Sequence, residues 1–120
     1  MILVDTSVWA DHWRAANTRL SDLLIDGQIL THPFVIGELA CGQFRQRAEV
    51  LTLMNNLGQT PPVTHDEALA FIDSHRLMGT GLGWIDVHLL ASAALTRTQL
   101  WTRDNRLLRA ARRLGIGYAP

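Results

Sequence analysis

The chain has 120 residues, enough for one hydrophobic core and too few for two domains. Eleven arginines balance eleven acidic residues, so the formal net charge is zero, which excludes a generic basic nucleic-acid binder. The single cysteine, with no secretory signal and no apolar run of membrane-spanning length, predicts a cytoplasmic protein without structural disulfides.

The first four residues, 1–4, are apolar and predict a strand buried in a parallel sheet. Asp5 follows this strand directly, and a helical pattern begins at Thr6 and Ser7. Ligands bind at such strand-to-helix corners in open α/β sheets, which makes Asp5 a candidate site residue. The alternative is that Asp5, Thr6 or Ser7 serves only as a helix N-cap.

A second strand is expected at residues 28–31, and the helix after it carries Glu38. The helical neighbours of Glu38 are Phe34, Val35 and Cys41, so the sequence predicts a carboxylate on an apolar helix face. A carboxylate in that place is costly unless a cation compensates it. Cys41 itself is interpreted as a small core residue and not as a nucleophile.

The stretch of residues 45–83 contains no diagnostic motif. Within it, Thr64 and Glu67 have the spacing of a capping box, which predicts the start of a helix. The glycine-rich segment 79–83 lacks both the Rossmann spacing and the lysine of a phosphate-binding loop. It is therefore interpreted as a flexible connection that delivers Asp86 to the site.

Two more carboxylates recur in similar settings. Asp86 precedes Leu89 and Leu90 by one helical turn, although a first-turn aspartate favoured by the helix dipole is the alternative. Asp104 follows a short strand expected at residues 100–102, and its alternative is again an N-cap. If the first and last of these strands are neighbours, Asp5 and Asp104 converge at one edge of the sheet. Residues 115–118 are a candidate for a final short strand.

The remaining acidic residues have simpler interpretations as caps, surface pairs or turn residues, which leaves four acids: Asp5, Glu38, Asp86 and Asp104. Hard cations such as Mg²⁺ and Mn²⁺ take oxygen ligands, retain several waters and bind phosphate. Zinc is not indicated, because one cysteine and five histidines show no ligand spacing. The four acids therefore predict a metal-dependent site for phosphodiester cleavage.

Four segments, in this order, resemble the PIN domain of VapC-type toxins: LVDTSVW at 3–9, the helix with Glu38, DVHLLA at 86–91 and TRDN at 102–105. The resemblance covers essentially the whole chain and implies a single PIN domain over residues 1–120. The implied fold is a three-layer α/β/α domain with a central parallel β-sheet, which agrees with the alternation of strands and helices.

The resemblance assigns the four acids as the catalytic group, with Ser7 and Asn105 as supporting residues. We expect Asp5, Asp86 and Asp104 to hold one or two Mg²⁺ or Mn²⁺ ions that activate water against an RNA phosphodiester. Four arginines are candidates for contacting RNA: Arg103, Arg106, Arg109 and Arg113. The last three share one helix face, and a merely solvated face is the alternative.

Partners follow from the resemblance as well. A VapB-type antitoxin would inhibit the toxin by laying its C-terminal segment across the groove, DNA would be contacted only through that antitoxin, and a homodimer is expected. Apolar candidates for these contacts, each with ordinary core as its alternative, are Trp9, Trp13, Phe44, Val50, Leu51 and Leu53. Trp13 and Phe44 are the better candidates because they lie at helix ends beside polar residues.

Two other classes of function share some of these features. A phosphoacceptor receiver-like domain also places aspartates at strand ends around Mg²⁺, but it usually needs a lysine, and this chain has none. A non-catalytic RNA-binding or interaction module with the same fold is the main alternative to the endoribonuclease.

Overall fold

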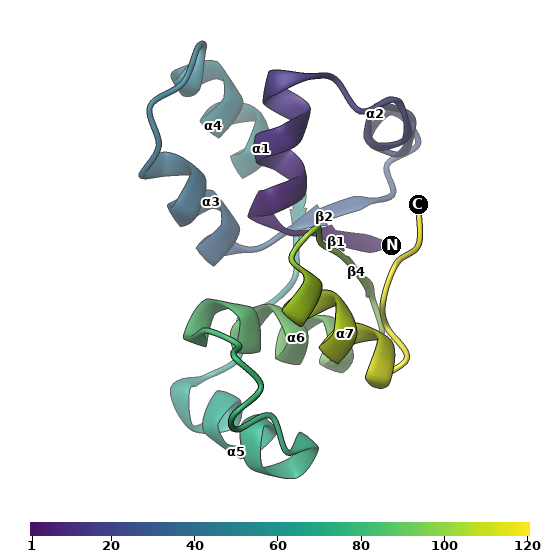
Figure 1. Ribbon diagram of the computed structural model, residues 1–120. Helices are drawn as coiled ribbons and strands as arrows, with labels where there is room; N and C mark the ends of the chain where they lie inside the picture. The colour runs from purple at the N-terminus through teal and green to yellow at the C-terminus, as the bar shows by residue number, and fades with distance from the viewer.

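A four-stranded parallel sheet lies between two layers of helices in the computed structural model, which describes all 120 residues (Figure 1). The strand order is β3-β2-β1-β4, and every neighbouring pair is parallel. The strands are β1 (Ile2–Val4), β2 (Ile29–Thr31), β3 (Gly58–Gln59) and β4 (Gln99–Trp101). The predicted three-layer α/β/α architecture with a central parallel sheet is confirmed.

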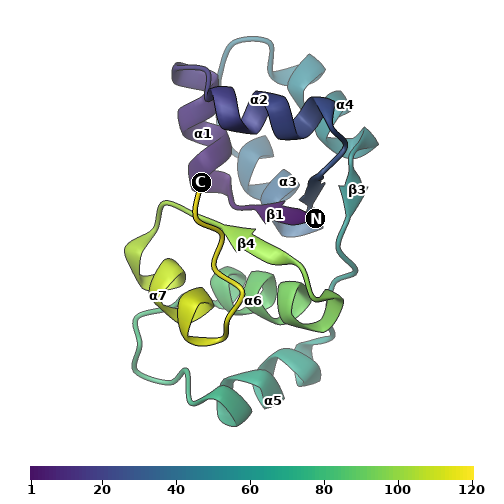
Figure 2. The same ribbon diagram turned by 90° about the vertical axis from the view of Figure 1, so that its right-hand side faces the viewer.

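Seven helices form the outer layers: α1 (Thr6–Arg14), α2 (Thr18–Ile25), α3 (Pro33–Ala40), α4 (Arg47–Asn56), α5 (His65–His75), α6 (Trp84–Thr96) and α7 (Asn105–Arg113). The first four lie on one side of the sheet and α6 and α7 on the other, with α5 packed outside α6 (Figures 1 and 2). None of the seven has the length and apolar character that a membrane span requires.

The hydrophobic core runs through the centre of both layers. Leu3 and Val4 are completely buried, because β1 has a strand on each side and helices over both faces. Trp9 on α1 fills the core on one side, and Leu89 and Leu90 on α6 fill it on the other. α6 is buried along residues 87–93 because it lies between the sheet and α5.

The register of the two central strands decides what meets at the carboxyl edge of the sheet. Val4 pairs with Trp101, so Asp5 and Thr102, the next residues of β1 and β4, lie side by side. The backbone N–H of Asp5 donates a hydrogen bond of 2.9 Å to the carbonyl oxygen of Trp101. Parallel pairing thus brings residues that are 97 positions apart to one edge.

The structure corrects two expectations about the sheet. The edge strand β3 was not predicted, because Gly58 and Gln59 are exposed and lack an apolar run. Residues 115–118 make only a single parallel bridge, between Leu100 and Gly117, and not a strand. The capping box is confirmed: the side chain of Thr64 accepts from the backbone N–H of Glu67 at 3.1 Å, and the Glu67 carboxylate accepts from that of Thr64 at 2.9 Å.

Candidate active site

Asp5 lies at the carboxyl end of β1, buried and held by two hydroxyl groups. Its Oδ2 accepts hydrogen bonds from Ser7 Oγ at 2.8 Å and from Thr102 Oγ1 at 2.7 Å, whereas its Oδ1 has no hydrogen-bond partner. Asp5 occupies the N-cap position of α1, but its side chain makes no capping hydrogen bond to the helix, so capping does not account for this carboxylate. The site therefore presents a fixed carboxylate with one free oxygen.

Thr102 connects Asp5 to the start of α7, a role that the sequence analysis missed. Its hydroxyl donates to Asp5 and accepts from the backbone N–H of Asp104 at 3.1 Å. Ser7 makes a similar link, because its hydroxyl accepts from the backbone N–H of Arg103 at 3.0 Å. The only sign of this role in the local sequence is a hydroxyl residue two positions before an aspartate. It predicts a contact with Asp5 only once β1 is known to pair with β4.

Asp104 and Asp86 are each oriented through one oxygen. Asp104 Oδ1 accepts from the backbone N–H groups of Arg106 and Leu107 at 2.9 and 3.0 Å, so this side chain is indeed the N-cap of α7. Asp86 Oδ2 accepts from the backbone N–H of Gly83 at 3.0 Å. The second oxygen of each carboxylate has no hydrogen-bond partner. Capping and a functional role are therefore compatible at both positions.

Asp5 and Asp104 lie close enough to Asp86 for their charges to act on its carboxyl group. Burial raises the pKa of Asp86 above its ordinary value, and the charges of Asp5 and Asp104 raise it further. The hydrogen bond from Gly83 opposes this shift without cancelling it. The negative charge of Asp86 is therefore unfavourable in this setting, and a bound cation would stabilise it.

Glu38 on α3 contacts the first residue of α1, next to Asp5, but it is not buried as expected. The buried face of α3 carries Val35 and Leu39, and Glu38 lies on the exposed side. Thr6 Oγ1 donates to Glu38 Oε1 at 2.8 Å, which ties the end of α3 to the start of α1. Its neighbours are apolar as expected, but the expectation that this face is buried was wrong, because apolar residues at three- and four-residue spacing also occur beside a buried stripe.

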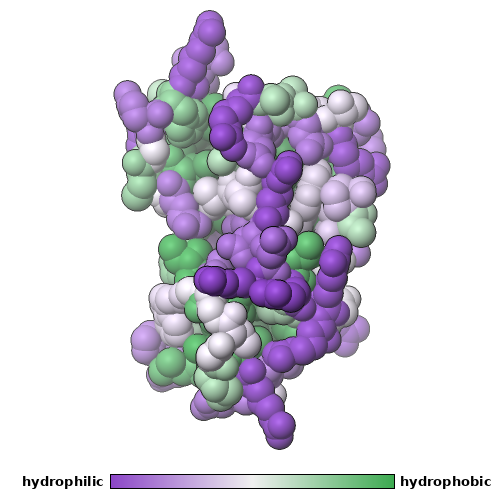
Figure 3. Space-filling view, in the orientation of Figure 1, coloured by the Kyte–Doolittle hydropathy of each residue, from purple (hydrophilic) through white to green (hydrophobic).

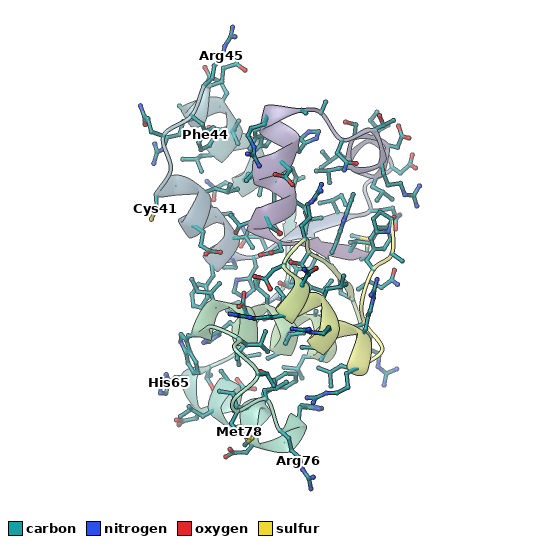
Figure 4. All side chains as sticks on the ribbon, viewed as in Figure 1. Cys41, Phe44, Arg45, His65, Arg76 and Met78 are labelled. Carbon is teal, nitrogen blue, oxygen red and sulfur yellow. The ribbon has the colours of Figure 1, made fainter.

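Cys41 is also exposed, which corrects its interpretation as a core residue. It points outward from α3 (Figure 4) and borders a hollow of about 340 Å³ between α3 and the start of α6. Phe34 and Trp84 line the same hollow.

The remaining candidates divide between the site and other places. Asn105 is exposed, and its side chain makes no hydrogen bond with the four acids. Arg103 forms an ion pair of 2.9 Å with Asp11, which Arg14 also contacts. Neither residue joins the carboxylate cluster.

The six apolar contact candidates separate in the same way. Trp9 and Val50 are core, whereas Leu53 is 45% exposed and Leu51 is half-buried. Trp13 and Phe44 are half-buried and line a hollow of about 320 Å³ beside Glu38, which keeps them as the better contact candidates.

The donor set fits a hard divalent cation. Asp5, Asp86 and Asp104 supply oxygen donors only, each with one free oxygen, and both ion pairs of the chain use Asp11 and none of the four acids. The structure contains no group of three or more His, Cys, Asp or Glu side chains that could hold a metal ion by themselves, so waters and substrate phosphate would have to complete the coordination. Mg²⁺ suits such a site, since it commonly binds through one or two carboxylates and several waters.

The hydroxyl of Thr102 should matter for activity beyond its effect on folding. Replacing it in Thr102→Val removes a donor to Asp5 and an acceptor for Asp104, and we expect cleavage to fall about tenfold to a hundredfold. Thr98→Val is the matched control, because Thr98 is equally buried at the opposite end of β4 and its hydroxyl bonds only to Thr96. Equal cleavage rates in both variants, measured with the same RNA, would contradict the positioning role.

Comparison with known proteins agrees with the geometry. The PIN-domain family profile matches residues 2–113. The chain belongs to the PIN-domain family. Ribonuclease VapC32 of Mycobacterium tuberculosis, from strains H37Rv and CDC 1551, is 52% identical over 120 residues, covering 99% of this chain and 97% of the relative. Within the PIN-domain family, the chain is therefore of the VapC type.

A solved structure supports the PIN fold independently of sequence. The crystal structure of PAE2754 from Pyrobaculum aerophilum superposes with a TM-score of 0.61 over 95% of this chain and 94% of that one. Its sequence identity is 16%, so this likeness concerns the PIN fold alone.

Proposed function

We propose that this PIN domain is a Mg²⁺- or Mn²⁺-dependent endoribonuclease and the toxin of a type II toxin–antitoxin pair. The observation that carries the proposal is the convergence of Asp5, Asp86 and Asp104, each with a free carboxylate oxygen and no basic partner. The VapC32 relatives are named as ribonucleases, which supports RNA as the substrate class.

The proposed mechanism gives each side chain a separate task. The bound metal ion would lower the pKa of water and neutralise charge on the scissile phosphate. Asp5, Asp86 and Asp104 would hold that ion, and Ser7 and Thr102 keep Asp5 in one orientation. Glu38, fixed through one oxygen by Thr6, would orient the attacking water with the other.

The VapC type also supports a VapB-type antitoxin as partner. We propose that this antitoxin covers the acidic edge and the hollow lined by Trp13 and Phe44, so that inhibition and substrate exclusion are the same event. We also propose that the protein forms a homodimer. Its proposed location is the cytoplasm, where it would meet both the antitoxin and the cellular RNA.

The first test is cleavage of total cellular RNA by purified, antitoxin-free protein with Mg²⁺ or Mn²⁺. We expect discrete products that vanish with EDTA and that fall at least about a hundredfold in Asp5→Asn, because metal-assisted charge stabilisation is worth several kcal/mol. Asp11→Asn, which removes a carboxylate outside the cluster, serves as the control. Binding of RNA without turnover by folded, metal-loaded protein would instead favour a non-catalytic module.

A further inference from the structure

Three arginines of α7 surround one hollow together with the loop between α5 and α6. This arginine hollow has a volume of about 270 Å³ and is lined by Leu77, Thr80, Arg106, Arg109, Ala110 and Arg113. Figure 3 shows hydrophilic side chains gathered across the middle of this face, over the start of α7. The arginines therefore line a concave surface formed by both α7 and the loop. This differs from a simple solvated helix face, which would consist of α7 residues alone.

The loop and the end of α5 each hold one of the three arginine side chains in place. Gly81, at φ +83°, packs so closely on Arg106 that an added Cβ would lie 2.9 Å from its Cδ. Arg113 donates from its guanidinium to the backbone carbonyl of His75 at the end of α5. Arg109 lies between them in sequence and has no hydrogen-bond partner in the protein.

No negative charge of the chain neutralises these side chains. None of the three arginines forms an ion pair, because both ion pairs in the structure join Asp11 to other arginines. Three guanidinium groups around one hollow repel one another, and a bound anion would remove that repulsion. Guanidinium groups match phosphate oxygens in a two-pronged geometry, so phosphate is the anion that this lining suits.

The position of the hollow relates it to the acidic cluster. Arg106 is two residues after Asp104, and α7 carries Arg109 and Arg113 away from the site over about 10 Å at 1.5 Å per residue. A strand whose scissile phosphate lies at the four acids would thus pass its neighbouring phosphates along this helix face.

We propose that the arginine hollow binds the backbone phosphates of the RNA strand that flanks the cleaved bond. This inference rests on the proposed function for its ligand, and it adds a subsite that contacts phosphate and not the bases. The loop holds Arg106, and the end of α5 holds Arg113. Arg109 supplies a guanidinium group that is free to bind phosphate. Arg103, paired with Asp11, is outside this subsite.

The test compares Arg109→Gln with Arg45→Gln. Arg45 is exposed at the far tip of the loop between α3 and α4, remote from α7, so its variant removes the same charge elsewhere (Figure 4). The readout is anisotropy of a labelled single-stranded RNA in EDTA, so that binding is measured separately from metal-dependent cleavage. Melting curves check that both variants remain folded.

We expect Arg109→Gln to bind RNA about tenfold more weakly than the wild type, the loss of one charge-assisted contact. The slope of log affinity against log salt should also fall by about 0.7, the value for one phosphate contact on a single strand. Arg45→Gln should match the wild type in both. Equal affinity and equal salt slope in the two variants would overturn the subsite. Failure of the wild type to cleave RNA would instead count against the proposed function, and the binding comparison would still decide the subsite.

Discussion

Asp86→Asn should abolish cleavage and yet stabilise the metal-free fold. Cleavage should fall at least about a hundredfold, because the variant loses a metal-binding carboxylate. The amide oxygen can still accept the hydrogen bond from Gly83, so the start of α6 is preserved. Thermal melting in EDTA at neutral pH should show a higher midpoint than the wild type.

The melting midpoint should rise because the pKa of Asp86 is raised in the folded protein. Burial is the main cause of the raised pKa, and the charges of Asp5 and Asp104 add to it. A carboxyl with a folded pKa above its unfolded value adds stability below pH 3.8, the ordinary aspartate pKa, and that stability is lost as pH rises through the folded pKa. At neutral pH the wild type has lost it, whereas the neutral amide has no such penalty.

Two further measurements complete the Asp86 test. Added Mn²⁺ should raise the melting midpoint of the wild type and leave that of Asp86→Asn nearly unchanged, because a ligand stabilises only the state that binds it. Asp66→Asn, at the exposed first turn of α5, is the matched control and should retain full activity. A lower midpoint for Asp86→Asn in EDTA would show that the carboxylate is structural.

The wild type should lose about 2 kcal/mol of unfolding free energy between pH 7 and pH 4.5 through His32 alone. His32 is completely buried at the end of β2, and burial lowers its pKa from 6.5 to about 4, with a smaller contribution from the charge of His88. Its Nδ1 accepts the backbone N–H of Phe34 at 2.9 Å, which caps α3 only while that nitrogen is unprotonated.

The direction follows because the unfolded chain binds the proton more readily than the folded one. Stability is fully present above pH 6.5 and decreases as pH falls toward 4. His32→Asn keeps a side chain that can cap α3 but cannot titrate, so its unfolding free energy should change about 2 kcal/mol less between the two pH values.

Urea denaturation at pH 7 and pH 4.5, in EDTA, measures this difference directly. The asparagine leaves unfilled volume and lowers stability at both pH values, so the informative quantity is the change with pH and not the absolute stability. His75→Asn, at the end of α5, should follow the wild type. A pH dependence of His32→Asn equal to that of the wild type would contradict the assignment.

Much of the fold followed from local patterns. The apolar run before Asp5 predicted the strand β1 to within one residue, since a strand buried on both faces has no polar alternation. The capping box placed the start of α5 through side chain to backbone bonds that involve only four consecutive residues. The edge strand β3 escaped, because two exposed residues paired through their backbone leave no such pattern.

The acidic residues of the candidate site could be selected from the sequence, whereas the residues that hold them in place could not. Aspartates after apolar strands are visible in the sequence, and so Asp5 and Asp104 were identified together. Thr102 was missed because its importance arises from a partner 97 residues away. Glu38 was expected on a buried apolar face because of its apolar helical neighbours. Such neighbours do not distinguish the buried stripe of a helix from its exposed border, and Glu38 lies at the border.

The sequence by itself determined the strand and helix types, the four acids and the absence of lysine and of a zinc-binding pattern, because these depend on residue identity and short spacing. Only the tertiary structure decided that β1 lies beside β4, that Ser7 and Thr102 hold Asp5, and that Arg106, Arg109 and Arg113 enclose a hollow with the α5–α6 loop. The physical reason is that strand order and register are contacts between distant segments, which the packing of the whole core fixes and no local pattern encodes.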